Sequence, residues 1–244
     1  AEKMPFMKQK KIYILLTRTK TMVSRTIHLA TGDSFTHVSV AFDGELESLC
    51  SFGRLKPFFP LPAGLVRESL DGGYFRRHQD VDCMLCAIAV SDAAYKAARD
   101  KAAAMLRHRE DYLYSIRGLA LCRLGIEESR PGHYFSSQFV SELLESTGEV
   151  MLPKPASLMR PQDVAELPGL RCLYRGEISG LQHGTGSFRG GSGLVGSAGH
   201  CISERYESKR NAPQMARSGN CSGFSDALRS CLFTIGRAHT PPCF

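Results

Sequence analysis

The segment at residues 133–144 constrains the fold of this chain more than any other. From Ser137 onward, its apolar residues recur at the spacing i, i+1, i+4, i+5, which is typical of an amphipathic helix. Pro131 and Gly132 end any helix that precedes it. Ser136 is therefore expected at or beside a helix N-terminus, where unpaired backbone N–H groups and a partial positive charge gather.

This position gives Ser136 two interpretations. A nucleophile at a helix N-terminus has its anionic form stabilised, and the free N–H groups beside it can receive an oxyanion. Serine is also a preferred N-cap residue, so Ser136 or Ser137 can simply cap the helix. The segment by itself favours capping, and a catalytic role requires a base elsewhere in the chain.

Apolar and alternating runs predict an antiparallel sheet packed against helices, an α+β fold. We expect strands at 11–17, 35–42, 46–52, 81–90 and 172–174. Asp43-Gly44 is a strong hairpin signal between the second and third strands. Ser91 is expected to cap a helix at 92–108, and shorter helical segments are expected at 22–30 and 112–124.

Composition divides the chain into a leader at 1–10, one domain at 11–180 and a tail at 181–244. Ten glycines, nine serines and three prolines fall among the 62 residues from position 183 onward, so we expect the tail to be mostly disordered. Within the domain, the segments 54–73 and 151–168 are rich in Pro or Gly. We expect both to be irregular loops that line a cleft.

Charge and cysteine content exclude several classes of function. The net charge is +7 but dispersed, which does not indicate a nucleic-acid reader. No apolar run approaches the roughly 18 residues of a membrane span, and the run at 12–16 is too short for a signal peptide, so a cytoplasmic protein is expected. Cys83 and Cys86, three apart on one strand, point to opposite faces and chelate poorly; we expect neither a metal nor a cofactor.

His37 is the best candidate base, because it is the one histidine before the tail that falls within a well-formed predicted strand. The alternative is a structural histidine satisfied by a backbone carbonyl. A base needs an orienting group. A turn at 43–45 pairs His37 with Ser51, whereas a two-residue turn pairs it with Cys50. Glu47 is chemically the better orienter but lies further along the strand.

The motifs F-T-H-V-S-V-A-F-D (35–43) and Y-F-S-S-Q-F-V-S-E-L-L (134–144) together resemble the circularly permuted branch of the NlpC/P60 superfamily, papain-like amidases of the YiiX/YaeF kind. Their order along the chain matches that branch: the histidine strand first, a polar residue on the next strand, and the nucleophile helix last. The phrase S-F-G-R (51–54) is also similar to a segment of the family. The resemblance covers about residues 11–178.

The resemblance implies attack on an amide, ester or thioester carbonyl of a peptide- or acyl-containing substrate. His37 would be the base, Ser51 or Glu47 its orienter, and Arg54 a contact for a substrate carboxylate. The alternative is that Ser51 and Glu47 are polar surface residues of a strand and that Arg54 is an ordinary solvated charge. Where the family has cysteine, this chain has Ser136, as an engineered change, a natural variant or an inactivating one. A catalytically dead binding protein on the same fold, or an unrelated α+β domain, are the alternatives. Substrate identity and oligomeric state stay open.

Overall fold

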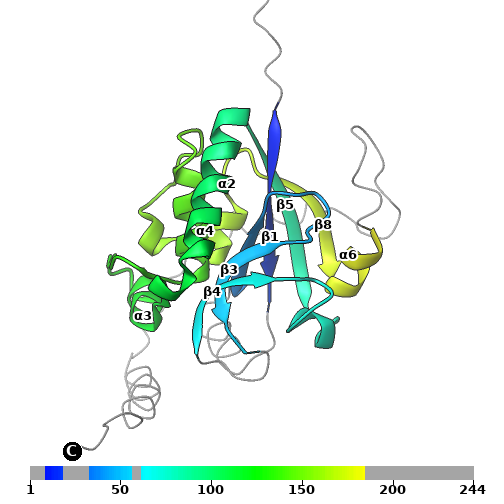
Figure 1. Cartoon of the computed structure of the whole chain (residues 1–244), viewed down its shortest axis with the longest axis horizontal. Helices are drawn as coiled ribbons and strands as arrows, with labels where there is room; N and C mark the ends of the chain where they lie inside the picture. Colours follow the sequence, from blue (N-terminus) through cyan, green and yellow to red (C-terminus); the bar gives the residue numbers. More distant parts are fainter. Residues whose placement is uncertain (1–8, 19–32, 57–61, 185–244) are drawn as a thin grey trace, which may run out of the picture. The chain divides into compact units, whose positions relative to one another are not determined.

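The computed structural model describes residues 9–18, 33–56 and 62–184, and one eight-stranded sheet organises them (Figure 1). The strands follow the order β7-β6-β4-β3-β2-β1-β5-β8. Neighbouring strands run antiparallel except β6 and β7, which are parallel. The predicted α+β class is therefore confirmed.

The strands are β1 (Lys10–Thr17), β2 (His37–Ala41), β3 (Leu49–Arg54), β4 (Ala63–Glu68), β5 (Asp82–Val90), β6 (Leu113–Tyr114), β7 (His133–Tyr134) and β8 (Arg171–Glu177). The helices are α2 (Asp92–Arg107), α3 (Ile116–Arg123), α4 (Ser136–Glu145), α5 (Pro161–Ala165) and α6 (Ile178–Gly184). Three short 3-10 turns complete the set: η1 (Phe75–Arg77), η2 (Arg109–Asp111) and η3 (Ala156–Leu158).

The central strands of the sheet are buried on both faces, which explains why β1 is apolar along most of its length. Ile12, Ile14 and Leu16 enter one core, which also contains the apolar side chains of α2 and α4. Leu15 points the other way, into a second core that contains side chains of α6 and η1. We call these the α4-side core and the α6-side core; Figure 1 shows α4 and α6 on opposite sides of the sheet.

The apolar stripe that the sequence predicts is confirmed on helix α4. The four apolar residues of the stripe are fully or almost fully buried in the α4-side core: Phe139, Val140, Leu143 and Leu144. The ring of Phe139 lies 5.2 Å from that of Phe52 on β3, and α4 packs against both β2 and β3. Burial of such side chains contributes roughly 1.5–3 kcal/mol each, so this stripe holds the helix on the sheet.

Several predicted boundaries hold and others do not. The cap of α2 is confirmed, because the Ser91 hydroxyl accepts a hydrogen bond from the Ala94 backbone N–H at 3.2 Å. The segment 54–73 contains β4, and 151–168 contains η3 and α5, so neither is simply an irregular loop. Helix α6 extends past position 180, the expected end of the domain. The expected helix at 22–30, residues 1–8 of the leader and the tail beyond 184 lie outside the described residues.

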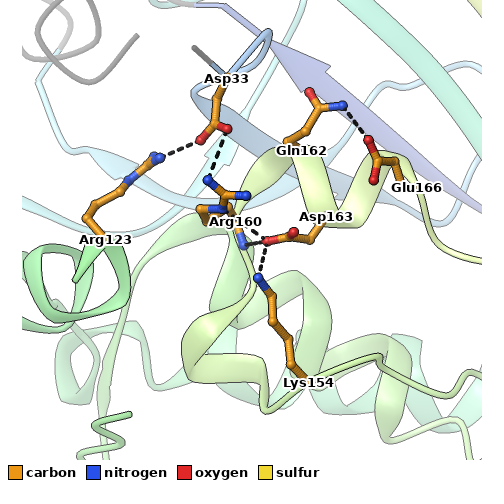
Figure 2. A network of polar contacts seen from close by, with 7 residues as sticks. All are labelled: Asp33, Arg123, Lys154, Arg160, Gln162, Asp163 and Glu166. Carbon is orange, nitrogen blue, oxygen red and sulfur yellow. Dashed lines mark hydrogen bonds and ion pairs between the residues drawn. The ribbon is translucent and has the colours of Figure 1, made fainter. Parts of the chain in front are cut away.

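A buried network of charges fastens the segment before β2 to the helices (Figure 2). The Asp33 side chain is only 4% exposed, and it receives Arg123 Nη1 at 2.5 Å and Arg160 Nη1 at 3.3 Å. Arg160 also bonds through its backbone N–H to Asp163, at 2.7 Å. Lys154 Nζ lies 2.7 Å from the same Asp163 oxygen. Asp33 thus connects the lead-in to β2 with the end of α3 and the start of α5.

Replacing Asp33→Ala leaves Arg123 and Arg160 without this carboxylate in a poorly hydrated site. We expect a loss of about 3–5 kcal/mol in the free energy of unfolding, since breaking one side of a buried ion pair strands the other charge. Urea denaturation measures it. Asp100→Ala is the matched control, because its pair with Arg99 is exposed and is worth about 1 kcal/mol or less. Equal losses in the two variants contradict the buried role of Asp33.

Candidate active site

His37 is the first residue of strand β2, and its side chain contacts a carboxylate on β4, two strands away. Its Nε2 lies 3.0 Å and 3.1 Å from the two carboxylate oxygens of Glu68, at the end of β4. The buried hydroxyl of Ser39 donates to Glu68 Oε2 at 2.5 Å and lies 3.3 Å from His37 Nε2. The side chains of His37 and Glu68 are 14% and 19% exposed, so the pair is largely shielded but reachable.

Glu68 is held in its ionised form. Burial raises the pKa of this carboxyl, but the attraction of His37, the hydrogen bonds from His37 and Ser39, and the charge of Arg54 together place the pKa below its ordinary value of 4.5. An ionised carboxylate only accepts hydrogen bonds, so His37 Nε2 carries the proton that faces it. In the neutral ring Nδ1 is then the basic nitrogen, and it makes no hydrogen bond within the described ranges.

Glu68, and neither Ser51 nor Glu47, is the residue whose side chain contacts His37. The Ser51 hydroxyl is buried and donates to the Val38 carbonyl at 2.5 Å. Glu47 is exposed in the connection between β2 and β3, where its backbone N–H bonds to Asp43. Neither residue makes a hydrogen bond to His37 in the described part of the chain, so the structure corrects the expected contact.

The cause is the register of the hairpin. Strand β2 pairs Val40 with Cys50, so neither expected short turn forms, and the register extends to place Gly53 opposite His37. The connection is longer because Leu46, at a φ of 56°, buries its side chain in the α6-side core. The burial of one apolar side chain in the loop therefore overrides the short turn that Asp43-Gly44 predicts.

Gly53 is what allows Glu68 to reach His37 across β3. A Cβ atom at this position would lie 3.2 Å from Glu68 Oε1 and 3.5 Å from His37 Cε1. A side chain on the intervening strand would therefore occupy the space that the two groups share. The glycine in the segment S-F-G-R (51–54) could have indicated this contact, since a glycine within a strand often marks a close approach of other groups.

Ser136 is the first residue of α4 and is not its cap. The N-cap is Phe135, in an extended conformation, and no side chain caps the helix. The capping interpretation is therefore wrong for both Ser136 and Ser137. Ser136 is 5% exposed and Ser137 is 1% exposed. The backbone N–H groups at the start of α4 have no acceptor inside the helix, so they remain as donors for an oxyanion.

Helix α4, which begins with Ser136, packs against β2 on the face of Val38 and Val40. His37 and Ser39 pair with Thr17 and Leu15, so they belong to the other face, that of the α6-side core. Within the described residues no hydrogen bond joins Ser136 to His37. A serine nucleophile depends on a base that takes its proton, whereas a thiol is already partly ionised near neutral pH. As the chain stands, position 136 therefore suits a thiol better than a hydroxyl.

Three of the buried cysteines are poorly suited to act as nucleophiles. Burial raises the pKa of Cys50 and of Cys83 to about 12, and it also raises the pKa of Cys122. Cys83 lies in the α6-side core and Cys86 in the α4-side core, which confirms that the pair points to opposite faces. Among the described residues, no group of three His, Cys, Asp or Glu side chains is arranged to hold a metal ion.

Comparison with protein-family models, with curated proteins and with solved structures finds no match to this chain. None of the helices in the described ranges has both the length and the apolar character that crossing a membrane requires. The assignment of a function therefore depends on the geometry around His37, Glu68 and Ser136.

Gly53→Ala tests whether the contact between His37 and Glu68 depends on the absence of a side chain on β3 between them. The new methyl group would lie 3.2 Å from Glu68 Oε1, so the carboxylate has to shift by a few tenths of an ångström. We therefore expect a loss of about 1 kcal/mol in stability, at the low end for overpacking, and a changed ¹⁵N signal of the His37 ring. Urea denaturation and NMR measure the two effects. Gly72→Ala is the control, because its nearest neighbour, the Ser69 Cβ, lies at an ordinary 3.4 Å. An unperturbed His37 signal in Gly53→Ala contradicts the role of this glycine.

The lowered pKa of Glu68 predicts a pH-dependent contribution to stability. A carboxyl with a lowered folded-state pKa stabilises the fold above its unfolded pKa, and the contribution is lost as the pH falls through the folded value. We therefore expect Glu68→Gln to be less stable than the unchanged chain at neutral pH. The gap should close as the pH falls from the ordinary Glu value of 4.5 through the lower folded value. Urea titrations at a series of pH values measure this, and a gap independent of pH contradicts it.

Proposed function

We propose that residues 11–180 form a papain-like hydrolase or acyltransferase domain of the permuted NlpC/P60 kind, with Ser136 at the nucleophile position. The observation that carries the proposal is the His37–Glu68 pair, in which a carboxylate orients a histidine. The pair belongs to the same sheet as the one on which α4 packs, on its opposite face. The pair leaves Nδ1 as the basic nitrogen, and α4 begins with Ser136 and unpaired backbone N–H groups. A base, its orienter, a nucleophile position and oxyanion donors are the parts that acyl transfer needs.

Each part has a defined task in the reaction. His37 belongs to the sheet face opposite to α4, so the reaction requires its imidazole to reach position 136 past the end of β2, where His37 is the first residue. The group at position 136 then gives its proton to His37 Nδ1 and attacks the carbonyl carbon of an amide, ester or thioester. The carbonyl oxygen becomes an anion that the N–H groups at the start of α4 stabilise. His37 then passes the proton to the leaving group as its bond to carbon breaks. Water, activated by the same imidazole, releases the acyl group.

Glu68 fixes the tautomer and the direction of the ring throughout this cycle. Its two oxygens are engaged by His37 and Ser39, and its negative charge stabilises the imidazolium that forms in the first step. Arranged in this way, the carboxylate need not accept the proton itself.

A second candidate is a protein that binds an acyl or peptide group on this scaffold without cleaving it. The observation that favours it is Ser136, whose hydroxyl makes no hydrogen bond to His37 within the described residues. In that case the N–H groups of α4 hold a carbonyl or carboxylate oxygen, and no acyl intermediate forms.

Ser136→Cys separates the two candidates. A thiol at a helix N-terminus beside a base has a lowered pKa, so we expect turnover of p-nitrophenyl acetate and fast alkylation by iodoacetamide at position 136. Adding His37→Asn should lower turnover by about 10²–10⁴-fold. Stopped-flow absorbance and peptide mass spectrometry provide the measurements.

Ser137→Cys is the matched control, because it places a thiol one residue further along the same helix. Equal rates for Ser136→Cys and Ser137→Cys would remove the basis for a nucleophile position. Turnover by Ser136→Cys, together with none by the unchanged chain, supports the ancestral thiol enzyme and an inactive serine form. Acyl-enzyme formation by the unchanged chain would instead identify Ser136 as a working nucleophile.

A further inference from the structure

We propose that a pocket at the C-terminal end of α4 binds a small organic cation of the polyamine class. The pocket has a volume of about 450 Å³, within the range of small-molecule sites, roughly 300–1,000 Å³. Its walls come from α2, the connection after α3, the last turn of α4, and η3. Ser136 begins the opposite end of α4, so this inference is independent of the proposed function.

Three glutamates give the pocket its negative charge. Glu142 and Glu145 lie three residues apart in the last turn of α4, so they share one face of the helix, and Glu127 lines the pocket from the connection after α3. The C-terminal end of a helix carries a partial negative charge. Helix α4 has no basic residue in its last turn, so two carboxylates at this end favour a bound cation.

The charges of the pocket are not neutralised by ion pairs. Within the described residues, none of the three glutamates pairs with Lys or Arg, and Lys101, which also lines the pocket, pairs with no carboxylate. Glu128, by contrast, pairs with Arg117 at 2.9 Å. Three carboxylates against one ammonium group leave the pocket with two negative charges in excess.

Ser157 is an independent sign of a ligand. It is 5% exposed and Ala156 is 8% exposed, so these two residues form the deepest part of the lining. In the described part of the chain the Ser157 hydroxyl makes no hydrogen bond. It is not sealed inside the protein, because the unpartnered side-chain atoms that are fully buried there belong to other residues. A ligand with an N–H group would satisfy this hydroxyl, which is costly to leave unpaired.

The lining suits an organic cation better than a metal ion. The three carboxylates do not converge as metal ligands, since no such group of three is formed by the described residues. A polyamine carries ammonium groups separated by methylene segments. Its ammonium groups would donate charge-assisted hydrogen bonds to the glutamates and to Ser157. Its methylene segments would lie against Pro155 and Ala156, the apolar residues of the lining.

Isothermal titration calorimetry of the full chain with spermidine, at constant ionic strength, tests the proposal. We expect Glu145→Gln to lower the affinity by roughly tenfold, the value of a charge-assisted hydrogen bond, and Ser157→Ala to lower it by roughly threefold or more. Ser157→Ala is the sharper variant because it leaves the net charge unchanged. Glu110→Gln removes an equal charge from an exposed position in η2 and is the control. Urea denaturation checks that each variant is folded.

Four results would overturn the polyamine pocket. The first is no binding at millimolar spermidine. The second is an equal loss of affinity in Glu110→Gln, which assigns the effect to net charge. The third is an unchanged affinity in folded Ser157→Ala, which shows that the ligand does not reach the deepest part of the pocket. The fourth is Mg²⁺ that binds as tightly as spermidine and depends on the same residues. The reactivity of Ser136→Cys tests the proposed function separately.

Discussion

The candidate site depends on one contact, the hydrogen-bonded pair of His37 and Glu68 across strand β3. The pair orients the imidazole, keeps the carboxylate ionised despite burial, and selects Nδ1 as the basic nitrogen. It forms because β3 carries Gly53 where a side chain would occupy the shared space. A glycine, a serine that donates to the carboxylate and an arginine at the strand end therefore surround the pair that holds the candidate base.

Helix α4 connects this polar pair to the hydrophobic interior. Its apolar stripe is buried against β2 and β3, so the position of its N-terminus follows from core packing. The same strands that receive the stripe carry His37 and Gly53. The network around Asp33 adds a second attachment, because it ties the lead-in to β2 to α3 and α5. The proposed base and nucleophile positions are thus held by separate parts of the fold, on opposite faces of a single sheet.

Local patterns predicted the elements well where packing agrees with them. The stripe of α4, the Ser91 cap of α2, the opposite faces of Cys83 and Cys86, and most strands followed from periodicity alone. The orienter of His37 did not, because short turn rules placed Ser51 or Cys50 opposite it. Burial of Leu46 lengthened that connection and shifted the register. Strand β4 lies in a segment rich in Pro and Gly, which predicts a loop, so local patterns do not indicate Glu68.

The sequence by itself determined the α+β class, the helix that begins at Ser136, and His37 as a strand histidine, because each depends on local periodicity and turn residues. Only the tertiary structure decided which carboxylate faces His37, that Ser136 is not a cap, and that Arg54 stacks on Tyr74. The physical reason is that these contacts join residues from different strands and helices. Their distances are set by register and core packing, and neither can be read from neighbours along the chain.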